Sequence, residues 1–233
     1  MTSTPVPSAT ESRPLHVRFR KFLGRLRRRF NVDRYDVFLR EVPAEDAPLA
    51  SPAEYGFAWG TPEDIAGCDE FHTELDERER RAGVARLGYG HKVVVAFHGD
   101  EIVFSMWVNP RNLNVPGLMK RALAEDQWFI YKAYTSPDHR GKKLYQSGMR
   151  FVLSEMRAAG KRQLVGYAHV KKRISRRGLA ALSFTSGGRA VQYDCPGLRR
   201  VSLSSELVRA FPRALEPSGV PMYPDAATIP DPT

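Results

Sequence analysis

A run of basic residues follows a turn in the middle of the chain, and its residue types suit the binding of a phosphate. The segment 130–135 is rich in Ile, Tyr and Thr, as strands are, and Ser136-Pro137-Asp138 is turn chemistry. Arg140-Gly141-Lys142-Lys143 comes next, and from Leu144 to Gly160 apolar residues recur at helical spacing. A strand, a basic loop and a helix start in succession aim several backbone N–H groups and a positive helix dipole at one point. The sequence therefore predicts an anion site over residues 140–146.

This loop resembles the acetyl-coenzyme A loop of the GNAT superfamily, the general N-acetyltransferases. The family pattern is Gln or Arg, two residues, Gly, one residue, then Gly or Ala, often within Pro-x-x-Arg-Gly-Lys-Gly-x-Gly. Pro137 and Arg140-Gly141-Lys142 match this pattern. Lys143 and Tyr145 stand where the two loop glycines are usual.

A second segment also resembles the family. Many GNAT proteins carry Asn-x-x-Ser and, nine residues after the Ser, the Phe of a Gly-Phe pair. In this chain Ser175 is followed nine residues later by Phe184, and Lys172 stands at the Asn position. The resemblance covers about residues 91 to 195. It implies that acetyl-CoA or another acyl-CoA is the co-substrate and that no metal takes part.

The resemblance also implies which residues contact the coenzyme. The strand before the loop pairs with the pantetheine arm and supplies the oxyanion donor by its backbone. The loop holds the pyrophosphate, and the second segment lies beside the coenzyme. The residues expected to bind it are Ala133, Thr135, Arg140, Gly141, Lys142, Lys143, Leu144, Tyr145, Gln146, Lys172 and Ser175.

Acyl transfer from a thioester to an amine also needs a base for the amine and benefits from an acid for the thiolate. Many family members use a Tyr four residues after the serine, and that position is Leu179 here. We therefore take Ser175 and Tyr134 as catalytic candidates near the thioester, with Tyr131 and Tyr167 as alternatives. Glu125 is the candidate base at the head of the central strand. The alternative bases are Asp126 and His169, although a structural role is favoured for the histidine.

The elements that must position these residues follow from hydrophobic periodicity and turn signals. Their order predicts a mixed α/β fold with a GNAT-like central, mostly antiparallel twisted sheet flanked by helices and a strand–loop–helix acyl-CoA site. The expected strands are 33–42, the hairpin 92–97 and 102–108, 127–135, 163–170 and two short ones within 184–204. The expected helices begin at Thr61-Pro62 and at Glu70 (to Val84), cover about 118–124 within a loop over the active site, and span 144–160 and 171–182.

Composition limits the class of protein. The chain has 233 residues, of which 42% are hydrophobic, which suits one globular domain with a sizeable core. Its two cysteines, Cys68 and Cys195, make neither a disulfide framework nor a metal site. No apolar run approaches a membrane span and no secretory signal precedes the domain, so we expect a cytoplasmic protein.

Charge concentrates at the N-terminus. The chain carries +10, and residues 1–30 contribute +7 of it from eight Lys/Arg and Glu11. We therefore expect a basic, partly disordered arm over 1–30, an acyltransferase domain over 31–210 and a Pro-rich tail over 211–233. Residues 15–30 are amphipathic, with Phe19, Phe22 and Leu26 among the apolar residues of one side. This segment could lie on an anionic membrane surface, bind an acidic partner, or pack on the domain; nucleic acid is a weaker alternative.

Two functions stay open at this point. The first is an N-acyltransferase that moves an acetyl or longer acyl group from acyl-CoA to a primary amine, on a small molecule or a protein. The second is a catalytically silent GNAT-like binding module, held at a membrane surface or by an acidic partner. The binding module is favoured by Leu179, Lys143, Tyr145 and the basic arm. The acyltransferase is favoured by Arg140-Gly141-Lys142.

Overall fold

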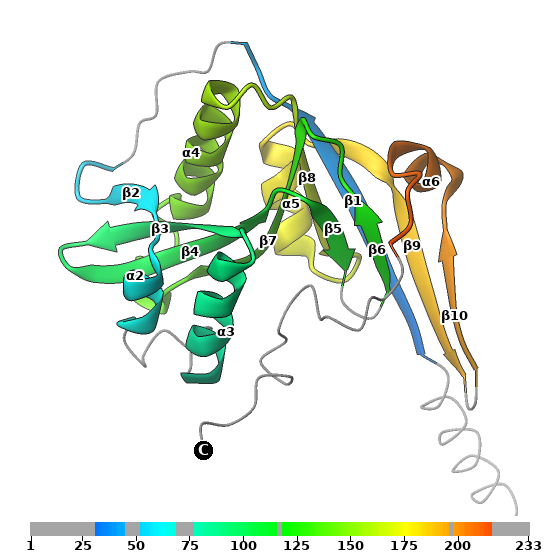
Figure 1. The fold of residues 1–233 in the computed structure, drawn as a ribbon, viewed down its shortest axis with the longest axis horizontal. Coiled ribbons are helices and arrows are strands. Elements are labelled where there is room, and N and C mark those ends of the chain that lie inside the picture. The colour runs from blue at the N-terminus through cyan, green and yellow to red at the C-terminus, as the bar shows by residue number, and fades with distance from the viewer. Residues whose placement is uncertain (1–30, 45–51, 69–76, 116–117, 196–197, 216–233) are drawn as a thin grey trace, which may run out of the picture.

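An eight-stranded sheet forms the centre of the protein, which a computed structural model describes over residues 31–44, 52–68, 77–115, 118–195 and 198–215 (Figure 1). The strand order is β10-β9-β1-β8-β7-β4-β3-β2, and every neighbouring pair is antiparallel except β7 and β8. The strands are β1 (Asn31–Glu41), β2 (Gly56–Trp59), β3 (Lys92–His98), β4 (Glu101–Asn109), β7 (Gln127–Thr135), β8 (Gln163–His169), β9 (Thr185–Cys195) and β10 (Leu198–Leu203). This confirms the predicted mixed α/β fold with a mostly antiparallel sheet.

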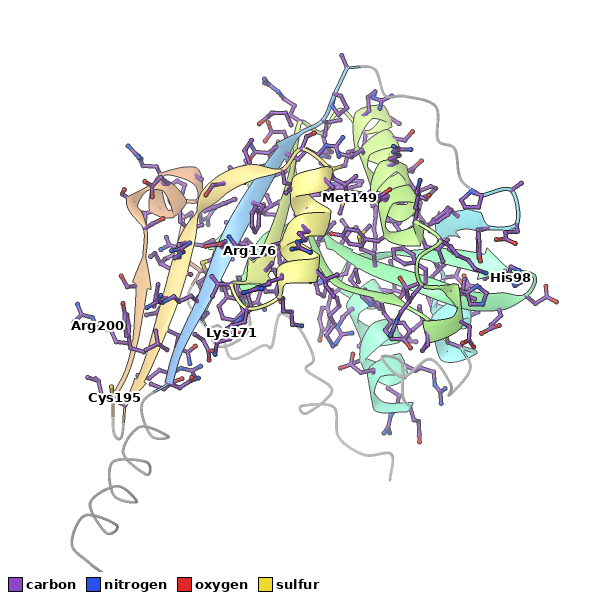
Figure 2. All side chains as sticks on the ribbon, turned by 180° about the vertical axis from the view of Figure 1, so that it is seen from behind. His98, Met149, Lys171, Arg176, Cys195 and Arg200 are labelled. Atoms are coloured by element: carbon purple, nitrogen blue, oxygen red, sulfur yellow. The ribbon has the colours of Figure 1, made fainter. Side chains whose placement is uncertain are left out.

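Helices cover both faces of this sheet. The helices are α2 (Pro62–Ala66), α3 (Glu77–Gly88), α4 (Leu144–Ala158), α5 (Arg173–Ala181) and α6 (Ser205–Ala210), with a 3-10 turn η1 (Pro137–His139). Figure 2 shows α4, marked by Met149, and α5, marked by Arg176, on the same side of the sheet. Thr61 caps α2 with a reciprocal capping box, as its Thr-Pro start predicts.

The core is divided by the sheet into two clusters. Residues of α4 and α5, such as Met149 and Leu179, pack on one face with Phe104 and Ile130. The opposite face holds the other cluster, which includes Val37, Trp107 and Phe129. Contact between α4 and the sheet is close at Gly148, where an added Cβ would lie 2.5 Å from Phe104 Cε1. A larger residue there would push the helix away from the sheet.

The sheet opens between its two parallel strands, β7 and β8. Their pairing covers only Gln127 to Phe129 against Gln163 to Val165, and beyond these residues the two strands no longer pair. On its other edge β7 has a bulge, because Ser105 faces Tyr134 while Trp107 faces Tyr131, and Lys132 in between has φ +46°. The C-terminal half of β7 therefore has one backbone edge that no neighbouring strand occupies.

The predicted helix at about 118–124 is wrong. The chain instead forms a small hairpin, β5 (Asn112–Val115) and β6 (Met119–Ala122). Leu113, Val115 and Leu118 are buried in the second core cluster, and Leu113 and Val115, two positions apart, share one face of a strand laid on the sheet. The expectation that this segment covers the active site is also not met, since none of its described residues lines the cavity presented below.

The other helices and strands differ less from those that the sequence predicts. Both β2 and α6 were not predicted, and β9 has 11 residues where a short strand was expected. The described part of the helix predicted from Glu70 is α3, which continues to Gly88. The predicted arm and most of the predicted tail lie outside the described residues.

Candidate functional site

The loop before α4 presents a row of backbone N–H groups. Gly141 has φ +78° and Lys143 has φ +63°, and α4 begins directly after them at Leu144. Among the described residues, no backbone carbonyl accepts a hydrogen bond from the N–H groups of residues 141–145. Left-handed residues next to a helix N-terminus turn such groups toward one point, which is the geometry of an anion-binding nest.

The side chains of the loop divide into two roles. The Arg140 guanidinium folds back, and its Nε donates a hydrogen bond of 3.1 Å to the carbonyl of Thr135. It thereby ties the loop to the end of β7. Lys142 and Lys143 are exposed and add positive charge beside the free N–H groups. Leu144 is 2% exposed and belongs to the core, so only its backbone faces the loop.

A cavity of about 600 Å³ lies where β7 and β8 separate. Its walls come from β7 and β8, from α5 and from the start of α4; Ile130, Ala133, Tyr145, Ala168 and Leu179 are among its lining residues. The lining combines apolar side chains with several phenols and His169. The opening of the sheet, and not a groove on its surface, therefore makes the room for a ligand.

The structure brings together part of the predicted set. Ala133 of β7, Tyr145 of α4, and Lys172 and Ser175 at the start of α5 line the cavity. Thr135, Gln146 and residues 140–144 are not among the lining residues and form the loop that leads to it.

Two catalytic candidates do not join the site. Glu125 is exposed and precedes β7, at the end where β7 and β8 still pair, and Lys161 Nζ donates to its backbone carbonyl. Tyr134 is 8% exposed and is absent from the described residues that line the cavity. Both predictions rested on nearness along the strand, but Glu125 lies at the paired end of β7, away from the opening, and Tyr134 lies in the unpaired half without lining the cavity. We therefore do not retain Glu125 and Tyr134 as catalytic candidates.

Two tyrosines in the cavity have hydroxyl groups that bond to no described residue. Burial raises the pKa of Tyr145 and that of Tyr167 to about 12, so both phenols keep their proton at neutral pH. The Tyr145 ring lies against α5, where a Cβ on Gly178 would be 3.3 Å from Tyr145 Cε1. Tyr167 lies on β8 with its ring 6.0 Å from that of Tyr35.

His169 is held on both ring nitrogens. Its Nδ1 accepts from the backbone N–H of Lys171 at 3.1 Å, so the proton of the neutral ring lies on Nε2, 3.2 Å from Asp33 Oδ1. Tyr35 stacks edge-on against the same ring at 4.9 Å. This arrangement agrees with the structural role favoured for His169, although its ring also lines the cavity.

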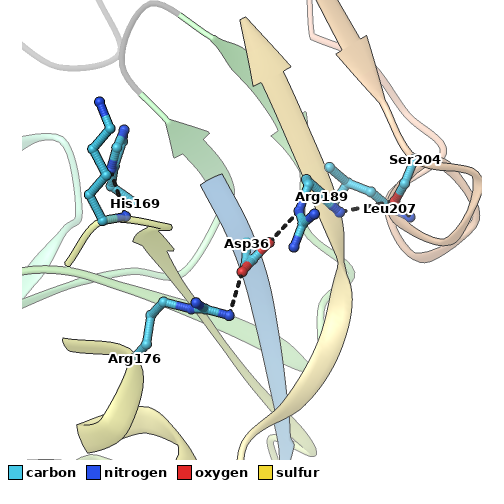
Figure 3. Close-up of polar contacts among 7 residues, drawn as sticks. Asp36, His169, Arg176, Arg189, Ser204 and Leu207 are labelled. Atoms are coloured by element: carbon cyan, nitrogen blue, oxygen red, sulfur yellow. Dashed lines mark hydrogen bonds and ion pairs between the residues drawn. The ribbon is translucent and has the colours of Figure 1, made fainter. Parts of the chain in front are cut away.

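A buried carboxylate holds α5 over the sheet. Asp36 on β1 is 6% exposed and accepts from Arg189 Nε at 2.6 Å, and it lies 3.0 Å from Arg176 NH2 of α5 (Figure 3). Because α5 carries Lys172 and Ser175 at the cavity, this double ion pair positions one wall of the site. No local pattern predicts it, since Asp36 lies far along the chain from Arg176 and Arg189.

The family follows from comparison with known proteins. A family model described as an acetyltransferase (GNAT) domain matches residues 54–178, more than half of the 233-residue chain. The chain therefore belongs to the GNAT acetyltransferase family, whose chemistry is acyl transfer. No curated protein matches it.

Solved structures of similar fold are distant in sequence. A GNAT-family structure from Novosphingobium aromaticivorans is 14% identical with a TM-score of 0.48, and the match covers 69% of this chain and 63% of that one. The protein yncA from Salmonella typhimurium, with its cofactor acetyl-CoA, is 18% identical with a TM-score of 0.43 over 57% of this chain and 80% of that one. AAC(6')-Iy, in complex with the bisubstrate analogue CoA-S-monomethyl-acetylneamine, is 12% identical with a TM-score of 0.45. The match covers 57% of this chain and 92% of that one.

Proposed function

We propose that this protein transfers an acetyl or longer acyl group from acyl-CoA to a primary amine by direct attack of the amine on the thioester. The observation that carries the proposal is the row of free N–H groups at 141–145, placed beside a cavity of about 600 Å³. The row suits a diphosphate, and the unpaired edge of β7 suits an extended, amide-containing arm that leads from it into the cavity.

Every bond and proton of the proposed reaction can be followed from the acyl-CoA and the amine to the products. The amine nitrogen forms a bond to the thioester carbon, the carbonyl oxygen becomes an oxyanion, and the C–S bond then breaks. Backbone N–H groups on the unpaired edge of β7 are the proposed donors to the oxyanion. The amine loses one proton to a base or to water, and the thiolate leaves and gains one.

Two phenols are the proposed donors to the leaving sulfur. Tyr145 and Tyr167 stay protonated at neutral pH because burial raises each pKa to about 12, and neither hydroxyl bonds to a described residue. Ser175, which lines the cavity from α5, is the proposed hydrogen-bonding partner of the coenzyme. These roles replace those that the sequence suggested for Glu125 and Tyr134.

The acceptor is proposed to be a primary amine on a small molecule or a protein. A small-molecule amine has a parallel in AAC(6')-Iy, which was solved with a CoA-linked analogue of an acetylated amine. The proposed setting is cytoplasmic, with the basic segment 15–30 as a contact to an anionic membrane surface or an acidic partner.

A second candidate is a binding module that holds acyl-CoA or a similar ligand without catalysis. Leu179 favours it, because a leucine that is 2% exposed supplies no proton at the position where many family members have a tyrosine. Under this alternative the protein binds acetyl-CoA but no amine accelerates release of the thiol.

Calorimetric titration of the protein with acetyl-CoA tests the site by comparing the dissociation constants of wild type and Gly141→Val. Valine is strained at φ +78° and would displace the N–H row, so we expect at least tenfold weaker binding. Gly160→Val is the matched control, because Gly160 has φ +66° and free space around it but ends α4 at the other end.

Equal loss of affinity in the two variants would mean that strain in the fold, and not the loop, weakens binding. Thiol release from acetyl-CoA over a panel of amines then separates the two candidate functions.

A further inference from the structure

A cluster of side chains beside the loop includes Lys142 of the loop and three residues that have no part in the site described above. Tyr55 precedes β2, His98 lies at the tip of the β3–β4 hairpin (Figure 2), His139 ends η1 and Lys142 belongs to the loop. The rings of His98 and His139 are 5.0 Å apart, and Tyr55 lies 5.3 Å from His98 and 5.8 Å from His139. Lys142 Nζ is 5.7 Å from the centre of the Tyr55 ring. None of the four is among the described residues that line the cavity.

The hydrogen bonds of the cluster leave donors free. The Tyr55 hydroxyl, on a residue only 5% exposed, lies 3.0 Å from His139 Nδ1. When this hydroxyl donates to Nδ1, the proton of the neutral ring lies on Nε2, which bonds to no described residue. His98 is exposed and likewise makes no hydrogen bond with the described part of the chain. Tyr55 thus orients one imidazole whose outer N–H has no partner in the protein.

The cluster combines the ammonium of Lys142 and two imidazoles with the nearby carboxylates of Glu54 and Asp138. A hydrogen bond with Tyr55 raises the pKa of Lys142, and the charges of Glu54 and Asp138 act in the same direction, so this amine stays cationic. A dianion placed between the ammonium and the two imidazoles would accept a charge-assisted hydrogen bond from the Lys142 ammonium and hydrogen bonds from the ring N–H groups of His98 and His139.

The position of the cluster indicates which anion. His139 and Lys142 flank Arg140 and Gly141, so the cluster adjoins the N–H row that the diphosphate is proposed to occupy. An acyl-CoA carries, besides its diphosphate, a phosphomonoester on the 3′-oxygen of the same nucleotide. Two adjacent anion sites on the protein therefore match two phosphate groups on one ligand.

We propose that His98, His139 and Lys142 form a second anion site that binds the 3′-phosphate of acyl-CoA. The inference rests on the proposed binding of acyl-CoA and goes beyond it, because the loop alone would accept acyl-CoA and its 3′-dephospho form equally. With this site the protein selects the fully phosphorylated coenzyme.

Titration of wild type with acetyl-CoA and with acetyl-3′-dephospho-CoA tests the proposal. We expect the dephospho ligand to bind about tenfold more weakly, which is the value of roughly one charge-assisted hydrogen bond. His98→Gln should weaken binding of acetyl-CoA by about tenfold and leave the affinity for the dephospho ligand within about twofold. Lys161→Gln, a lysine at the opposite end of α4, is the control and should change neither affinity.

His98→Gln is preferred to changes at His139 or Lys142, which flank Arg140 and Gly141 of the loop, since His98 is exposed and makes no hydrogen bond with a described residue. Equal binding of the two ligands to wild type would overturn the second site and leave the proposed function standing. An equal loss for both ligands in His98→Gln would also overturn it, because the cluster would then support the loop and not a phosphate. If wild type binds neither ligand, the proposed function itself fails, and this inference fails with it.

Discussion

Lys143 adopts a backbone conformation that favours glycine, at the position where the family pattern has its first loop glycine. Its φ of +63° places a side chain in the left-handed region, which costs about 1 kcal/mol or more. We expect Lys143→Gly to raise the free energy of unfolding by about 0.5–1 kcal/mol, since the strain removed exceeds the added chain entropy. Thermal unfolding measures the change.

Lys142→Gly is the control for this prediction. Lys142 is the preceding exposed residue and is not among those with positive φ, so glycine there should lower the stability or leave it unchanged. A stability gain in both variants would point to charge and not to backbone strain.

A substitution at Leu179 tests whether an added proton donor can act in this cavity. The residue lines the cavity from α5 and is 2% exposed. We expect Leu179→Tyr to raise turnover with an accepted amine, but by less than the roughly 10²–10⁴ in rate that one proton transfer in the transition state is worth, because Tyr145 and Tyr167 are already proposed donors. Turnover from pH 6 to 9 measures the effect.

Leu179→Phe is the matched control, since it adds the ring without the hydroxyl. Both variants crowd the core and should lose about 1–3 kcal/mol of stability. A gain in rate common to both would exclude proton donation as its cause.

At the scale of elements, Glu79 connects α3 to the bulge of β7. It lies 2.8 Å from Lys132 Nζ and 3.1 Å from NH1 of Arg86, whose side chain is 2% exposed. Burial alone would raise the pKa of Glu79, but the hydrogen bonds and charges of Lys132 and Arg86 outweigh it and lower the pKa below 4.5. The stabilisation is therefore present above about pH 4.5 and is lost as pH falls through the lowered value in the folded protein.

We expect Glu79→Gln to lower the free energy of unfolding by about 1–2 kcal/mol at pH 7, and by less as the pH is lowered below 4. Denaturant unfolding across that range measures it. Glu77→Gln, an exposed change on the same helix, should have little effect at any pH. A Glu79→Gln effect that stays constant with pH would contradict the ion-pair explanation.

At the scale of the molecule, the basic arm is predicted to be dispensable for the fold. Residues 1–30 carry +7 and lie outside the described residues. Removing them should leave the melting temperature nearly unchanged and reduce binding to vesicles that contain an anionic lipid. Co-sedimentation with such vesicles measures the loss.

Deletion of residues 1–14 alone is the control, because it removes the Ser/Thr/Pro segment and keeps the amphipathic one. A fall of many degrees in the melting temperature of the longer deletion would show that Phe19, Phe22 and Leu26 belong to the core.

None of the described helices has the length and apolar character that a membrane span requires. Within the described ranges, no group of three or more His, Cys, Asp or Glu side chains gathers as a metal site would.

The sequence by itself determined the segments whose signals are local. The β3–β4 hairpin is encoded by two β-rich runs around a Gly-Asp turn, and the strand, loop and helix at 127–158 by a Pro turn and a change of period. The N–H row of residues 141–145 belongs to this group, because it comes from consecutive residues. Capping at Thr61 is local for the same reason.

Only the tertiary structure decided which side chains share the cavity. Tyr167 lines the cavity and Glu125 does not, because β7 and β8 separate only after Phe129 and Val165. Tyr134 lies beyond this point and is still not a lining residue. No single segment encodes where two parallel strands part.

The same holds for contacts between distant residues. Tyr55 and His139, 84 positions apart, meet because β2 and the loop adjoin the same end of the sheet. The β5–β6 hairpin forms where a helix was expected, since Leu113 and Val115 gain burial only against the sheet face. Burial against a distant element is a non-local free energy, and it outweighs a local propensity of a few tenths of a kcal/mol per residue.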